Sequence, residues 1–165
     1  VLTGAGNSSA ISPEGNLVFI IFFLTKSSLD ISWIELTGAT SIDYKDKFMC
    51  CGAGGAVRTT AKEISADFSR EKLTNIRDAG ADIIVDVCPF CHLQLDLGQL
   101  EANGIYKDMI GESFKTPVIY ITQLLGLAFG IDPSRLGLIK NHQLSGVPPF
   151  ISIEPFLNKV KEQLI

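Results

Sequence analysis

Four cysteines, the only ones in the 165-residue chain, fall into two pairs. Cys50 and Cys51 are adjacent, whereas Cys88 and Cys91 form a Cys-x-x-Cys motif. We expect each pair to follow a β-strand and to precede a helix, and the 36 residues between the pairs are about the length of one helix and one strand. The carboxyl ends of neighbouring parallel strands meet at one sheet edge, so the four thiols are predicted to converge. Four converging thiolates are typical of a metal centre, with an iron–sulfur cluster as the first expectation.

Other uses of these cysteines stay open at this point. A Cys-x-x-Cys motif also occurs in zinc sites and in thioredoxin-type redox pairs, so structural zinc and metal-free disulfide exchange are alternatives, with inert buried thiols as a third. Gly52, Gly54 and Gly55 follow the first pair. They resemble part of a dinucleotide-binding loop, but the last glycine of that motif is absent. Adjacent cysteines in extended chain point to opposite faces, so a tight turn at these glycines explains them better.

One of the cysteines and two residues near them are candidates for supporting the chemistry of the site. Cys88 lies at an expected helix start, where free amides and the helix dipole lower a thiol pKa from ~8.5 toward ~3.5–7.5. His92 follows the last cysteine and is a candidate proton donor to a leaving thiolate; a capping or supporting hydrogen bond is the alternative. Arg58 follows the glycine turn and is a candidate for an anionic substrate group or for the charge of a cluster, with a plain surface role as the alternative.

Apolar patterning predicts strands alternating with helices. The expected strands are residues 17–24, 40–43, 48–51, 83–87 and 117–121, and the expected helices are residues 29–37, 60–79, 90–103, 122–129 and 154–164. The first of these helices would present Leu29, Trp33 and Leu36 on one face, and the second would present Ile64, Phe68, Leu73 and Ile76. Alternating strands and helices imply an α/β fold with a mainly parallel sheet and flanking helices.

Composition limits the function classes. A net charge of −4 without a basic stripe argues against nucleic acid as a partner. The cysteines are too few and too clustered for a secreted disulfide scaffold, so a reducing, cytoplasmic location is expected. The apolar run at residues 17–24 is far shorter than the roughly 20 residues of a membrane span and follows no basic leader, so no transmembrane segment is expected.

The cysteine pairs with their neighbours resemble a known family. Residues 50–55 (CCGAGG) and 88–92 (CPFCH) look like the CCG domain, and residues 35–39, 43–44 and 122–128 are similar to the B subunit of heterodisulfide reductase, the methanogen enzyme. The resemblance covers roughly residues 29–138. We therefore divide the chain into a divergent N-terminal segment (1–28), a CCG-type iron–sulfur domain (29–147) and a tail (148–165) that is expected to be helical.

The resemblance implies a noncubane [4Fe–4S] centre that reduces the mixed disulfide of coenzymes M and B to two thiols. Cys50, Cys51, Cys88 and Cys91 match the last four of the family's five motif cysteines; the first would fall at residues 10–19, which hold none. The family subunit carries two CCG modules, and this chain resembles the C-terminal one. The resemblance implies an electron-donating iron–sulfur subunit as partner. The alternative is a non-catalytic module, with zinc or without metal, that docks to redox subunits through residues 17–24 or 147–165.

Overall fold

A four-stranded parallel sheet lies at the centre of the fold. The computed structural model describes residues 18–21, 33–139 and 149–163. Its strands are β1 (Val18–Ile21), β2 (Thr40–Ser41), β3 (Ile83–Asp86) and β4 (Val118–Tyr120), in the order β2-β1-β3-β4, and all neighbours are parallel. The predicted α/β class with a mainly parallel sheet is confirmed.

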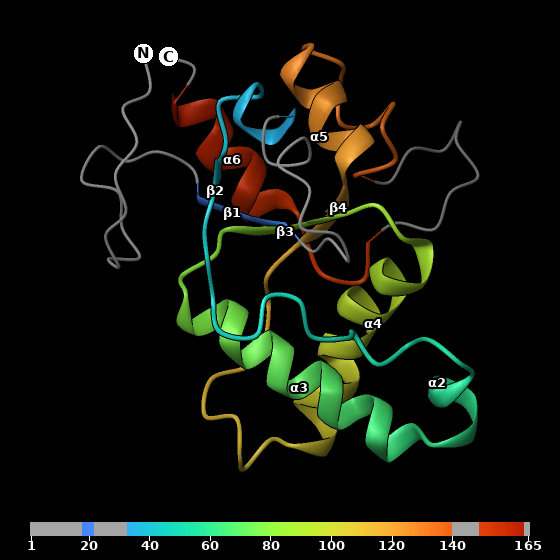
Figure 1. Cartoon of the computed structure of the whole chain (residues 1–165). Coiled ribbons are helices and arrows are strands. Elements are labelled where there is room, and N and C mark those ends of the chain that lie inside the picture. The colour runs from blue at the N-terminus through green and yellow to red at the C-terminus, as the bar shows by residue number, and fades with distance from the viewer. Residues whose placement is uncertain (1–17, 22–32, 140–148, 164–165) are drawn as a thin grey trace.

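Helices cover both faces of this sheet (Figure 1). The helices α2 (Val57–Thr60), α3 (Lys62–Asp78) and α4 (Pro89–Ile105) lie on one side, and α5 (Ile121–Ala128) and α6 (Glu154–Gln163) lie on the other. Alternate residues of β3 therefore face different cores. Ile84 packs into the α3–α4 core, which comprises Cys51, Ala53, Leu73, Ile76, Ile84, Cys91, Leu95, Ala102, Ile110, Phe114 and Val118. Ile83 and Val85 pack into the α5–α6 core with Ile34, Ala39, Ile119, Leu124, Leu138, Ile153, Phe156 and Leu157.

The apolar run at residues 17–24 supplies an inner strand. Phe19 is in register with Ser41 of β2 on one side and with Ile83 of β3 on the other. The strand expected from the sequence is thus confirmed over residues 18–21. Because both of its edges are hydrogen-bonded, β1 offers no free edge to a partner strand.

Only the second part of the first predicted helix lies within the described residues. Residues 33–35 are helical there, and Gly38 follows with a φ of +83°. Trp33 and Leu36 are 56% and 76% exposed, whereas Ile34 is fully buried, so the predicted apolar face is wrong at Trp33 and Leu36. Leu29 lies outside the described residues, and the predicted length of this helix stays a prediction.

The predicted apolar face of α3 is correct only in its second half. Leu73 and Ile76 are buried as expected, but Ile64 and Phe68 are exposed. The buried residues in the first half are Ala66 and the polar Ser65, Ser69 and Lys72. This half of the helix packs against the loop that carries the first cysteine pair, and backbone carbonyls there need hydrogen-bond donors.

The expected strand at residues 48–51 is absent from the structure. Residues 45–48 form a turn in which Asp46 has a φ of 56° and the Met49 N–H donates to the Asp46 carbonyl (2.8 Å). Cys50 and Cys51 therefore follow a turn instead of a strand. The second cysteine pair is placed as expected, because Cys88 follows β3 and is the N-cap residue of α4.

The last elements are close to those predicted. Helix α4 continues to Ile105. Helix α5 begins at Ile121, one residue earlier than expected, and Tyr120 is its N-cap residue, whose N–H donates to the Gln123 side chain (2.8 Å). Helix α6 confirms the helical tail, and Phe156 and Leu157 of this helix are buried in the α5–α6 core.

The tail is also tied to α4. Asp96, itself buried, accepts hydrogen bonds from the backbone N–H groups of Phe150 (2.8 Å) and Ile151 (2.9 Å). The buried face of the tail is thus occupied within the chain and is no free docking surface. The division at residues 28 and 147 stays a prediction, but β1 and α6 share a sheet and a core with the middle segment.

Candidate metal centre

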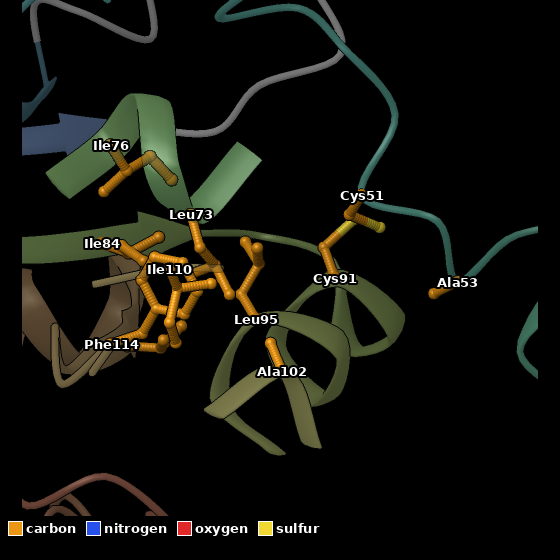
Figure 2. Packing of buried hydrophobic residues seen from close by; sticks show 11 residues of the cluster. Cys51, Ala53, Leu73, Ile76, Ile84, Cys91, Leu95, Ala102, Ile110 and Phe114 are labelled. Atoms are coloured by element: carbon orange, nitrogen blue, oxygen red, sulfur yellow. The ribbon is translucent and has the colours of Figure 1, made fainter. Parts of the chain in front are cut away.

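Two cysteines from distant parts of the chain meet at the sheet edge. The Sγ atoms of Cys51 and Cys91 are 3.1 Å apart, and the two residues are only 3% and 5% exposed. Figure 2 shows them pointing toward one another, Cys51 from the loop and Cys91 from the first turn of α4, beside Leu95 and Leu73. The predicted convergence of the two motifs is therefore observed for one cysteine of each pair.

The other two cysteines border this contact. Cys50 is exposed, and its Sγ accepts a hydrogen bond from the Gly52 N–H (3.4 Å). Cys88 is partly buried, and a hydrogen bond from its side chain to Cys91 contributes to the pKa of Cys91. Cys88 thus lies beside the contact between Cys51 and Cys91, whereas Cys50 stays at the surface of the loop, and the role of all four as ligands stays a prediction.

The buried pair shares a proton. A hydrogen bond from Cys91 is the largest cause that lowers the pKa of Cys51, to about 6, and the Ala53 amide and the charge of Lys72 act in the same direction against burial. The same hydrogen bond and burial raise the pKa of Cys91. The hydrogen bond therefore favours the thiolate form of Cys51 and the protonated form of Cys91.

This pairing predicts an early thiolate in the metal-free, reduced chain. Because the pKa of Cys51 is lowered to about 6, its thiolate is present above that pH and is lost as the pH falls below it. A titration followed by the ultraviolet absorbance of thiolate is expected to show a first step near pH 6, well below the ordinary thiol value of ~8.5. Cys91→Ala removes the donor and is expected to move this step to higher pH. A first step near pH 8.5 in the unsubstituted chain would contradict the shared proton.

Polar side chains under the loop hold the first cysteine pair in place. The Ser65 hydroxyl donates to the Gly52 carbonyl (2.9 Å), and the Ser69 hydroxyl donates to the Cys51 carbonyl (3.4 Å). Gln94 of α4 donates in turn to the Ser65 hydroxyl (2.9 Å). Sequence reasoning missed these residues. Their signal was a polar i, i+4 pair in line with buried Leu73 and Ile76 on one face of α3.

Arg58 belongs to the same network. Its guanidinium donates to the Gln94 side chain (2.6 Å) and forms an ion pair with Glu101 (2.8 Å). The structure therefore places Arg58 as a link between α2 and α4. A substrate anion would compete with these two partners, and the predicted substrate role stays a prediction.

His92 is held on two sides. Its Nδ1 lies 3.1 Å from the Asp86 carboxylate, and its ring stacks on Tyr120 with centroids 4.1 Å apart and planes 11° apart. Asp86 is fully buried at the end of β3, and burial raises its pKa although the His92 hydrogen bond opposes this. The alternative interpretation of His92 as a hydrogen-bonding residue is thus observed. Its predicted role as a proton donor stays a prediction, now with Asp86 and Tyr120 as its supports.

One glycine of the loop is required by its surroundings. Gly52 has a φ of +87°, and a Cβ atom there would lie 2.8 Å from both the Phe68 Cβ and the Ser65 carbonyl oxygen. Gly55 also has a positive φ (+62°), but nothing lies within 4 Å of its Cβ position, as is true of Gly54. The turn after Cys51 thus depends mainly on Gly52.

The donor set fits an iron–sulfur group in its chemistry. Thiolates are the protein ligands of such clusters, and backbone amides such as that of Gly52 are the donors that stabilise their sulfurs. Over residues 18–21, 33–139 and 149–163, no three Cys, His, Asp or Glu side chains surround a single point at metal-binding distance. Two thiolates on one zinc ion with bonds of about 2.3 Å lie roughly 3.8 Å apart, so the 3.1 Å pair must open for any metal.

Comparison with known protein families gives a match in the middle of the chain. The cysteine-rich domain family CCG matches residues 27–96, a stretch that contains all four cysteines. The match begins after β1 and ends within α4, so it includes β2, α2, α3, β3 and the first turns of α4.

The chain is similar to the B subunits of two heterodisulfide reductases. The chain is 50% identical over 108 residues to the B subunit of the Ferredoxin/F(420)H(2)-dependent CoB-CoM heterodisulfide reductase of Methanosarcina acetivorans. It is 48% identical over 108 residues to the B subunit of the Ferredoxin:CoB-CoM heterodisulfide reductase of Methanosarcina mazei. In both cases the similarity spans 66% of this chain and 35% of the relative. The chain thus matches about a third of the length of these subunits.

Another similar protein is named as an iron–sulfur protein. The chain is 37% identical over 79 residues to an uncharacterised iron–sulfur protein of Methanococcus maripaludis, which covers 46% of this chain and 15% of that protein. Within the described residues, every helix is too short or too polar to cross a membrane.

Proposed function

We propose that the chain is an iron–sulfur redox subunit, or a domain of one, of the heterodisulfide reductase type. Its reaction is the two-electron reduction of the mixed disulfide of coenzymes M and B to two thiols. The observation that carries the proposal is the contact between Cys51 and Cys91, whose sulfurs come from motifs 40 residues apart and lie 3.1 Å from each other. The similarity to the B subunits of two heterodisulfide reductases supports the choice of reaction.

The cofactor in this proposal is a [4Fe–4S] cluster, of the noncubane type by resemblance. Cys50, Cys51, Cys88 and Cys91 would hold it. When bound, such a cluster supplies electrons one at a time to a disulfide that needs two. The iron–sulfur relative and the cysteine-rich family support iron over zinc.

The residues around the thiols have distinct tasks. The Gly52 N–H donates to the Cys50 sulfur and so stabilises negative charge on it. In the metal-free chain Cys51 and Cys91 share a hydrogen bond, which both lose as they become ligands. The Asp86 carboxylate holds Nδ1 of His92, which leaves Nε2 as the ring atom that can give a proton to a leaving thiolate. The partner in this proposal is an iron–sulfur subunit that donates electrons.

Iron and sulfide analysis of the anaerobically prepared chain tests the proposal. We expect about four iron and four sulfide per chain and a broad absorption band at about 400 nm. A colourless protein that contains zinc, or a metal-free protein that stays colourless after reconstitution with iron and sulfide, would contradict it. Either result would favour the docking module instead.

His92→Gln tests the proton donor. In a reconstituted complex with its electron donor, the substitution is expected to lower the turnover of the mixed disulfide by roughly 10²-fold, the lower part of the range for general acid catalysis. Iron and sulfide content are expected to stay unchanged, because His92 is no ligand in this proposal. Unchanged turnover would remove His92 from the mechanism.

A further inference from the structure

Lys72 is a fully buried lysine beneath the first cysteine pair. It lies on the face of α3 that carries Ser65 and Ser69, and its relative exposure is 0%. Lysine is almost never fully buried unless its ammonium is paired, because moving the charge out of water is costly. The ammonium of Lys72 therefore requires hydrogen-bond acceptors or negative charge close to it.

The ammonium is fixed by the backbone just before the cysteines. Its Nζ donates to the carbonyl oxygens of Lys47 (2.9 Å) and Met49 (3.0 Å), and it lies 5.3 Å from the centroid of the Tyr44 ring. Met49 directly precedes Cys50 in the chain. Lys72 thus ties the turn at residues 45–48 to α3 at the point where the cysteine loop begins.

Negative charge that favours this ammonium comes first from the thiols. Burial lowers the pKa of Lys72 to about 8, and among the groups that raise it the largest contributions come from Cys51, Cys91 and Cys50, with Asp46 after them. The effect is reciprocal, because the charge of Lys72 contributes to the lowered pKa of Cys51. The geometry agrees, because the Lys72 ammonium is hydrogen-bonded to the carbonyl of Met49, the residue directly before Cys50.

We propose that Lys72 is a positioning residue of the metal centre, which fixes the loop before Cys50 and holds a buried positive charge beside the start of that loop. The holding of the loop follows from the hydrogen bonds alone, whereas the effect on a cluster rests on the function proposed above. Reduction of a cluster adds negative charge, and a nearby cation inside the protein stabilises that charge. Lys72 therefore favours the reduced form.

Lys72→Met tests both parts, because methionine keeps much of the length and apolar stem of lysine and removes its charge and donors. Lys62→Met on the same helix, where the lysine is exposed, is the matched control. In the metal-free protein we expect amide hydrogen exchange at residues 49–53 to become at least about 10-fold faster in Lys72→Met and to stay unchanged in the control. Unchanged exchange at these amides would overturn the loop-holding role.

The second measurement is the midpoint potential of the cluster, from a redox titration monitored by electron paramagnetic resonance. We expect the potential of Lys72→Met to shift to more negative values, and that of Lys62→Met to match the unsubstituted protein. An unchanged potential in Lys72→Met would overturn the electrostatic role. If Lys72→Met does not fold, Lys72→Gln, which keeps a donor but no charge, takes its place with the same expected shift. A chain without iron and sulfide would count against the proposed function, while hydrogen exchange would still decide the role of Lys72.

Discussion

Cys91→Ala is expected to abolish the metal centre in the anaerobically prepared chain. We expect iron and sulfide to fall from about four each per chain to a small fraction of that, and the band at about 400 nm to disappear. Cys91 is the residue at which the two motifs meet, since its sulfur contacts Cys51 and its pKa responds to Cys88. If Cys91 is a ligand as proposed, its removal costs that ligand and also the contact between the loop and α4.

The fold is expected to survive this change. Cys91 lies at the edge of the α3–α4 core, and a small side chain there costs roughly 1–2 kcal/mol of unfolding free energy, below the cost at a central core position. Circular dichroism would show helix content close to that of the unsubstituted chain. Leu93→Ala is the matched control, because Leu93 is exposed on the same helix and touches no thiol in the proposal. Full iron content in Cys91→Ala would exclude Cys91 as a ligand and, with it, the convergence on which the function rests.

Gly52→Ala is expected to have the largest effect of any single methyl group added to the loop. A left-handed φ of +87° is unfavourable for alanine by about 1–2 kcal/mol. The new Cβ would also lie 2.8 Å from the Ser65 carbonyl oxygen and from the Phe68 Cβ, neither of which is a flexible side-chain end. With overpacking of about 1–3 kcal/mol, the total loss of unfolding free energy is about 2–5 kcal/mol.

Gly54→Ala is the control for this substitution. Gly54 has no positive φ, and nothing lies within 4 Å of its Cβ position, so the change is expected to stay within about 0.5 kcal/mol. Urea denaturation of the two metal-free variants measures the difference. Equal stability of Gly52→Ala and Gly54→Ala would mean that the loop does not adopt the conformation described for it.

The parallel sheet could be predicted because its strands are short apolar runs between clear boundaries. Residues 83–87 lie between Gly80 and Pro89, and Pro89 fixes the start of α4. The segment at 48–51 misled the prediction because Phe48 and Met49 are apolar, yet Phe48 is half exposed and the chain turns there. A tertiary contact, the pair of hydrogen bonds from Lys72, holds that turn, and local sequence does not reveal it.

The cysteines of the candidate site could be predicted from the sequence, but the residues that hold them in place could not. Cysteine spacing located the residues that converge, and the sequence pattern also drew attention to His92. Lys72 and Ser69 were missed because their partners are backbone carbonyls, which every residue has and which no sequence motif marks. Asp86 was missed because it ends an apolar strand, where its carboxylate is buried beside the imidazole.

The place of β1 has a practical consequence for anyone who prepares this protein. The family match starts at residue 27, but β2 and β3 are joined only through β1 at residues 18–21. A recombinant piece trimmed to the match would also lack β4, so β2 and β3 would each lose all their neighbours and expose open strand edges, which favours aggregation. Samples for spectroscopy therefore have to begin upstream of Val18. If a shorter piece fails to bind iron, the missing strands explain the failure, and the result does not test whether the cysteines are ligands.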